Sequence, residues 1–193
     1  MDYLILVNRF EPLPEGYGEK LKLRTVQGKL FETQTAIMLE TMLDDALDDG
    51  IRIRVISGYR SDDYQQMLRE REISSNMGLG MDYLSAVRKT DKTLAPVGCS
   101  EHGTGLAADL CTWESDDVEP EFHRTAAGKW LCKRSSEYGF ILRYPRFKEH
   151  ITGIDYEPWH YRYVGRGAAK LISESGICLE EFLHFYSDKY TQC

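Results

Sequence analysis

Residues 100–110 have the sequence SEHGTGLAADL, with a histidine, two closely spaced glycines and an aspartate seven positions after the histidine. The segment 106–111 is small and apolar, which predicts a buried strand. On an alternating strand, Asp109 points away from the face that Leu106 and its alternate neighbours share. A carboxylate inside an apolar strand is costly unless it is paired. Asp109 is therefore either a metal ligand, with His102 as a second ligand, or a buried aspartate that caps a loop.

A second cluster, residues 156–165, has the sequence YEPWHYRYVG. Its aromatic residues alternate, which predicts that one strand face lies in a core: Trp159, Tyr161 and Tyr163. His160 then lies on the opposite face. A lone histidine on a strand is more often a core residue, but this one completes a set of two histidines and an aspartate. For zinc, three protein ligands leave a fourth position for water.

Glu157 precedes His160 by three residues, and Pro158 bends the chain between them. The carboxylate can therefore approach a metal-bound water without itself binding the metal. A general base in metal-assisted hydrolysis needs that position. The sequence thus predicts Glu157 as the base.

These clusters resemble motifs of the VanY-like D-alanyl-D-alanine carboxypeptidases. Residues 100–109 are similar to the family's S-x-H-x-x-G-x-A-x-D motif, and residues 157–165 to its E-x-W-H-x-x-x-x-G motif. Residues 57–61, SGYRS, match a third motif. The family belongs to a zinc superfamily that also contains lysostaphin-type endopeptidases and hedgehog signalling domains.

The similarity covers nearly the whole chain, residues 6–181. One residue departs from it: Gly103 stands where the family usually has glutamine. This change would widen the pocket or alter substrate preference, but it leaves the metal set untouched.

The resemblance implies a zinc D,D-peptidase that removes the terminal D-alanine from peptidoglycan precursor peptides. His102, Asp109 and His160 would hold Zn²⁺, and Glu157 would act as the base. Arg60, presented by a turn at the end of a strand, would either bind the substrate carboxylate in bidentate fashion or stabilise the tetrahedral oxyanion.

Two further residues each have a structural and a functional interpretation. By family resemblance Ser100 would help to hold the terminal carboxylate; otherwise it is a turn-forming serine ahead of the strand. Gln65 would line the substrate site by family resemblance. It also stands three residues after Asp62, the predicted cap of a helix, where it would complete a capping box.

Length, net charge and hydropathy indicate which classes of protein the chain can belong to. At 193 residues the chain fits one well-buried domain, residues 1–193, and its net charge of −7 argues against nucleic-acid binding. An anionic substrate would have to be captured by a local cation, since the overall field repels it. No run approaches the ~18 apolar residues of a membrane helix.

The cysteines form an odd set without a C-x-x-C pair, which indicates free thiols in a reducing compartment: Cys99, Cys111, Cys132, Cys178 and Cys193. We therefore expect a cytoplasmic protein; loss of an export segment would instead mean an extracellular or membrane-anchored one. Thiolate ligation is disfavoured because a complete oxygen and nitrogen donor set is available. A cysteine peptidase using Cys99 and His102 lacks an orienting third group.

Periodicity predicts an α+β fold, in which a small, largely antiparallel sheet carries the zinc site and helices pack on its other face. Strands are predicted at residues 3–7, 51–56, 106–111 and 140–144 and in the second cluster, and helices at 35–49, 62–71, 81–89, 125–138, 167–175 and 179–190. The remainder of residues 1–30 is expected to wrap the surface. Residues 72–98 are expected to be a loop-rich, movable cover, 112–122 an acidic turn region and 148–154 a hairpin-like connection.

The expected reaction is cytoplasmic hydrolysis of a peptidoglycan stem pentapeptide ending in D-Ala-D-Ala, with some cleavage of the free D-Ala-D-Ala dipeptide. This follows from the resemblance to soluble vancomycin-resistance enzymes that combine both activities. The alternative is a non-catalytic peptidoglycan- or partner-binding module on the same zinc fold, against which the presence of Glu157 and Arg60 argues. His123, His150 and His184 are expected to be structural or solvent-facing.

Overall fold

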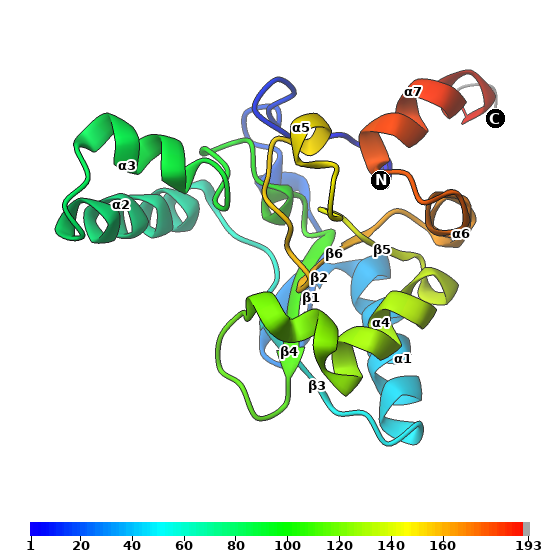
Figure 1. Cartoon of the computed structure of the whole chain (residues 1–193). Coiled ribbons are helices and arrows are strands. Elements are labelled where there is room, and N and C mark those ends of the chain that lie inside the picture. Colours follow the sequence, from blue (N-terminus) through cyan, green and yellow to red (C-terminus); the bar gives the residue numbers. More distant parts are fainter. Residues whose placement is uncertain (191–193) are drawn as a thin grey trace.

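Small antiparallel sheets and helices make up the computed structural model, which describes residues 1–190 and side chains as far as residue 186 (Figure 1). The predicted α+β class is confirmed. The elements are β1 (Leu23–Val26), β2 (Lys29–Glu32), α1 (Thr33–Asp48), β3 (Ile53–Ser57), α2 (Asp62–Gly78), α3 (Tyr83–Thr90), β4 (Ala107–Thr112), α4 (Ala126–Arg134), β5 (Phe140–Leu142), α5 (Glu149–Thr152), β6 (His160–Tyr163), α6 (Arg166–Ser175) and α7 (Leu179–Tyr190). Within residues 1–190, no helix has the length and apolar character needed to cross a membrane.

The register of the four-stranded sheet positions the site. Its strand order is β3-β4-β6-β5, and each neighbouring pair is antiparallel. Ser57 of β3 lies opposite Asp109 of β4, which in turn lies opposite His160 of β6. Residues directly opposite one another on neighbouring strands project from the same face. A row of polar side chains therefore crosses the sheet.

The apolar core lies on the other face, as the alternation predicted. Residues of β4 and β6 pack there with residues of α1 and α4: Leu106, Ala108, Leu110, Tyr161 and Tyr163 from the strand segments, and Ala36, Leu39, Met42 and Leu131 from the helices. Trp159 is only partly buried and packs against the edge of this cluster. Burial of these side chains holds the strands that carry the polar row, because apolar burial is the main favourable contribution to folding.

The N-terminal region differs from the expectation. Residues 3–7 are not a strand. Instead, β1 and β2 form a two-stranded hairpin within the segment expected only to wrap the surface. Gln27 and Gly28, at its turn, both have positive φ, 46° and 79°. Turns with two positive φ values match the twist of a hairpin, but Gln27-Gly28 is a weaker sequence signal than Asn-Gly.

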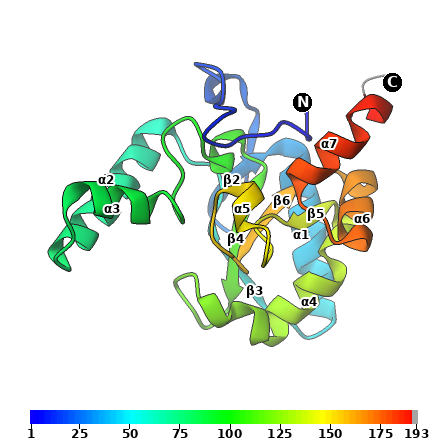
Figure 2. The same cartoon turned by 45° about the horizontal axis from the view of Figure 1, so that its top comes forward.

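Residues 72–98 contain more helix than predicted, although the helix expected at 81–89 is present as α3. Helix α2 continues to Gly78 and α3 packs against it, so that the two form a helical hairpin extending to one side of the sheet (Figures 1 and 2). The side chains that α2 buries are polar: Gln65, Arg69 and Asn76. Asn76 donates to Thr90 Oγ1 over 3.3 Å, and Arg69 pairs with Asp91 over 2.7 Å. Because the buried face of α2 is polar, the sequence has no apolar stripe that would have marked the full length of this helix.

Smaller differences concern element boundaries. The helix predicted at 125–138 divides into α4 and a 3₁₀-helix, Ser135–Tyr138, which ends at Gly139 with a φ of 90°. The connection at 148–154 contains α5 rather than a hairpin. The strand predicted at 140–144 ends earlier, at Leu142. The helices predicted at 35–49, 167–175 and 179–190 are present as α1, α6 and α7.

The close approach of β2 to the end of β3 gives a stability prediction. A Cβ at Gly58 would lie 2.4 Å from the Leu30 carbonyl oxygen and 2.7 Å from Phe31 Cζ. Because the carbonyl is backbone, we expect Gly58→Ala to lower the free energy of unfolding by ~1–3 kcal/mol in urea denaturation. Gly78→Ala is the control, since nothing lies within 4 Å of its added Cβ. Equal stability of the two variants would contradict the close approach.

Candidate metal centre and substrate cleft

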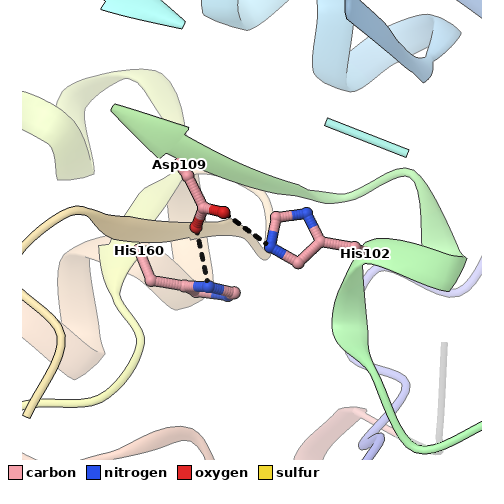
Figure 3. Close-up of side chains that lie close together, drawn as sticks. All are labelled: His102, Asp109 and His160. Carbon is pink, nitrogen blue, oxygen red and sulfur yellow. Dashed lines mark ion pairs between the residues drawn. The ribbon is translucent and has the colours of Figure 1, made fainter. Parts of the chain in front are cut away.

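Three side chains converge at the polar row of the sheet (Figure 3). His102 Nε2 lies 3.2 Å from Asp109 Oδ2, and His160 Nδ1 lies 3.1 Å from Asp109 Oδ1. One potential ligand atom from each residue lies within 4.8 Å of the others, and all three side chains are buried. The strand register brings Asp109 and His160 together, whereas His102 comes from the 3₁₀-helix Glu101–Thr104 just before β4.

The orientation of His102 suits a metal ligand. Its Nδ1 lies 2.7 Å from the Gly58 carbonyl oxygen. A carbonyl only accepts, so Nδ1 carries the proton and the lone pair of Nε2 faces Asp109. Burial and the nearby Arg60 lower the pKa of His102 to about 4. The imidazole is therefore neutral, as metal ligation requires.

The remaining donors also fit a zinc ion. Burial alone would raise the pKa of Asp109, but His102 and Arg60 hold it well below its usual range, so the carboxylate is ionised. Asp109 Oδ1 is buried without a hydrogen-bond partner. Burial lowers the pKa of His160, but the neighbouring carboxylates of Asp109 and Glu101 outweigh this effect and raise the pKa to about 9. Two imidazoles and a carboxylate are a common catalytic zinc set, and binding would displace the His160 Nδ1 proton.

Glu157 lies beside the three potential ligands without belonging to their group. Its Oε2 is 3.6 Å from His160 Nδ1, and its side chain lines the cleft. Burial raises the pKa of Glu157 to about 8, although the charge of His160 opposes this shift. A divalent cation at the neighbouring ligands would favour the ionised carboxylate, because an opposite charge stabilises it.

Arg60 follows β3 and reaches back to the polar row. Its Nε donates to Ser57 Oγ over 2.9 Å, and its Nη2 donates to Asp109 Oδ2 over 2.5 Å. The backbone N–H of Arg60 also donates to the His102 carbonyl. These contacts hold one guanidinium group next to the potential metal ligands, with 13% of its side chain exposed.

A cleft of about 680 Å³ opens onto these groups. It is lined by every site residue that the sequence predicts: Arg60, Gln65, Ser100, His102, Asp109, Glu157 and His160. Other parts of the lining come from side chains of α2, from the segment 93–95 and from the turn 116–118. Part of the segment expected to be a cover is thus a wall of the cleft. Ser100 is largely buried, and its side chain makes no capping hydrogen bond to the following 3₁₀-helix.

The capping interpretation of Gln65 was wrong. Ser61, not Asp62, is the N-cap of α2, and its Oγ accepts from the Tyr64 N–H. Gln65 is therefore one position too far into the helix for a capping box. Its Nε2 donates to the Ala95 carbonyl over 2.8 Å, while its Oε1 is buried without a partner. The first bond joins α2 to the segment 93–95 in the wall of the cleft.

The cysteines have contacts that do not suggest metal binding. Cys111 Sγ donates to the Thr112 and Ser115 carbonyls, and burial raises its pKa to about 11. Burial also raises the pKa of Cys99. Both nitrogens of His102 already face other groups, so that histidine is not oriented toward a thiol. Cys193 lies outside the described residues.

The other histidines and Gly103 are not among the residues that line the main cleft. His150 and His184 are exposed, and His123 Nδ1 faces the Pro120 carbonyl. Gly103 lines a separate cavity of about 340 Å³ rather than the main cleft. A Cβ there would come within 2.8 Å of Leu13 Cδ1, so Leu13 occupies the space beside it. The expectation that glycine widens the metal-site pocket is therefore not supported by its position.

Sequence reasoning missed a group of buried charges behind His160. Glu101 is 1% exposed, and Arg143 and Arg162 are fully buried. Both guanidinium groups donate to Glu101 Oε1 over 2.7 Å. One feature of the sequence could have indicated a buried charge near His160. Arg162 is two residues after His160 on the same strand and therefore shares its face. Its partner Glu101 and the second arginine, Arg143, lie in other segments of the chain, and no local sequence pattern relates them to Arg162.

Comparison with known proteins agrees with this geometry. The family described as VanY, D-alanyl-D-alanine carboxypeptidase, matches residues 28–166. The chain belongs to this family. A D-alanyl-D-alanine carboxypeptidase of Enterococcus faecalis is 37% identical over 94% of the chain and 65% of its own length. The bifunctional D-Ala-D-Ala dipeptidase and carboxypeptidase VanXYC of Enterococcus gallinarum is 40% identical over 72% of the chain and 70% of its own length. The chain thus spans slightly less than two thirds of the E. faecalis relative.

Solved structures of VanY-type enzymes share the fold. The vancomycin-resistance D,D-pentapeptidase VanY of a VanB-type cassette, in complex with Zn(II), is 36% identical with a TM-score of 0.86, covering 95% of this chain and 99% of that one. The LD-carboxypeptidase LdcB is also 36% identical, with a TM-score of 0.78, covering 93% of this chain and 84% of that one. Neighbours at similar identity therefore include enzymes of both stereochemical types.

The metal group gives a direct prediction. We expect one zinc ion per purified chain and its loss in His160→Ala, because two protein ligands rarely retain Zn²⁺ in a catalytic site. Metal content measured by mass spectrometry tests this. His150→Ala is the matched control, since that side chain is exposed on α5. Stoichiometric zinc in the His160→Ala protein would remove His160 from the ligand set.

Proposed function

We propose that this protein is a zinc D,D-carboxypeptidase that removes the terminal D-alanine from peptidoglycan precursor peptides ending in D-Ala-D-Ala. The observation that carries the proposal is the position of Glu157: its buried carboxylate lies 3.6 Å from His160 Nδ1 and lines the same cleft as the His102–Asp109–His160 group. A zinc site with a separate base at the end of a substrate-sized cleft suits peptide hydrolysis.

In the proposed mechanism three residues bind the metal and a fourth transfers the proton. His102 Nε2, Asp109 and His160 Nδ1 would hold Zn²⁺, which would supply Lewis-acid polarisation of the scissile carbonyl and would lower the pKa of bound water to ~7. Glu157 accepts a proton from the attacking water as the new C–O bond forms. It then gives that proton to the amine nitrogen of the leaving D-alanine as the C–N bond breaks.

Substrate orientation is assigned to three residues of the cleft. Arg60 has two candidate roles, pairing with the terminal carboxylate or stabilising the oxyanion, and its place beside Asp109 suits both. Ser100 is proposed to donate its hydroxyl to the terminal carboxylate. Gln65 is proposed to accept a substrate N–H at its buried, unpartnered Oε1, since such an atom is costly without a partner.

We further propose that residues 1–193 act as one domain in the cytoplasm. Segments near both ends of the described chain contact the region of the sheet, because Arg162 of β6 donates to the Tyr3 and Ile5 carbonyls and Arg143, just after β5, pairs with Glu180 of α7. The cysteines of residues 1–190 are free thiols, which suits a reducing compartment. Fractionation of cells expressing the native gene, with antibody detection, tests the location.

The role of Glu157 is tested by a nearly isosteric change. We expect Glu157→Gln to retain zinc and thermal stability but to lose ~10²–10⁴-fold in kcat, because the amide cannot accept the proton. Zinc content and melting temperature are measured on the same preparation as the rate. A near-normal kcat would show that Glu157 has a structural role only.

The substrate class is tested with four peptides and the zinc-loaded protein. We expect release of D-alanine from a stem pentapeptide ending in D-Ala-D-Ala, slower cleavage of free D-Ala-D-Ala, and no cleavage of a tetrapeptide with an L,D bond. The fourth peptide, a pentapeptide amidated at its C-terminus, separates the roles of Arg60: slow cleavage supports carboxylate binding and equal cleavage supports the oxyanion role. Cleavage of the tetrapeptide alone would make the protein an L,D-carboxypeptidase. Pentapeptide binding without hydrolysis would leave the non-catalytic binding module.

A further inference from the structure

Glu101 lies directly behind a proposed metal ligand. Its Oε2 faces His160 Nε2 at 3.4 Å, on the side of the ring away from Asp109. Both atoms are buried, and neither has another hydrogen-bond partner among the described residues. Two buried polar atoms without partners are costly, and these two need only a slight contraction to satisfy each other.

The two nitrogens of His160 have different surroundings. Nδ1 lies 3.1 Å from Asp109 Oδ1, at the point where the ligand atoms converge. If Nδ1 binds the metal, Nε2 must carry the proton and becomes a donor that needs an acceptor. Glu101 Oε2 is the acceptor that the fold places there.

The arginines determine which oxygen of Glu101 is available. Arg143 Nε and Arg162 Nη1 both donate to Oε1 over 2.7 Å. Arg143 is itself held by Glu180 over 2.7 and 2.9 Å, and Arg162 by the Tyr3 and Ile5 carbonyls. Oε1 is therefore fully engaged, which leaves Oε2 for His160.

We propose that Glu101 is a positioning residue of the metal site, which accepts the Nε2–H of His160 and so presents the Nδ1 lone pair of that ring to the metal. The proposal rests on the metal site of the proposed function but not on the hydrolytic activity. A carboxylate that orients a ligating histidine raises its basicity and fixes its tautomer. The competing explanation is that Glu101 only neutralises two buried arginines.

Glu101→Gln separates these explanations. Both arginines require an acceptor, so the carbonyl oxygen of the new amide takes the place of Oε1 and its NH₂ group faces His160 Nε2. Donor then meets donor, which favours the His160 tautomer with its proton on Nδ1, where the metal should bind. We expect zinc affinity, measured by competition with a chromophoric chelator, to fall ~10–100-fold. Glu180→Gln is the matched control, because it removes a carboxylate from the same arginine network without contacting His160.

The control decides what the loss means. We expect Glu180→Gln to retain the wild-type zinc affinity even where it unfolds at a lower urea concentration. An equal loss of affinity in both variants, or none in Glu101→Gln, would overturn the proposal.

The wild-type protein gives a second test that does not depend on a variant folding. In the zinc-loaded form, the His160 Nε2–H proton should exchange slowly with solvent, and its resonance in ¹⁵N-edited spectra should be shifted downfield. A fast-exchanging proton would also overturn it. Zinc binding without D-alanine release would count against the proposed function and leave this inference standing.

Discussion

The pairing of Asp109 with His160 across two antiparallel strands is the constraint on which the site depends. A slip of one residue in β4 or in β6 would turn the polar side chain of that strand toward the apolar core. The core side chains on the opposite face, among them Leu110 and Tyr161, therefore determine where the polar atoms lie. His102 adds to this pair through a separate contact, its bond to the Gly58 carbonyl, which links the turn after β3 to the entrance of β4.

Most of the site could be predicted from sequence because its chemistry is concentrated in two short segments with clear alternation. Asp109 stands out as a charge inside an apolar strand, and His160 as the polar residue between aromatic ones. The metal group, Glu157 and the α+β class required no long-range information. Residue types and a period of two placed Asp109 and His160 on one face, since strand geometry determines which side chains share a face. The resemblance to the VanY-like motifs then selected these two residues and His102 as the metal ligands.

What the sequence did not predict depends on contacts between distant segments. Glu101 acquires its partners from β6 and from the residue after β5, and no local period relates these positions. The predicted end of helix α2 was too early. The buried face of this helix is polar, so hydrophobic periodicity stopped before the helix did. The role of Gln65 was misassigned for a simpler reason. A cap displaced by one residue, from Asp62 to Ser61, changes which side chain can reach it.

The polar buried face of α2 has a consequence for how this family can diversify. The α2–α3 hairpin packs chiefly on itself and contributes a wall of the cleft, while the apolar core lies under the sheet. Substitutions that reshape this wall therefore remove little apolar burial from the core, which is the main determinant of global stability. Substrate range and foldability are in this way encoded in largely separate parts of one chain, and selection can alter the first while conserving the second.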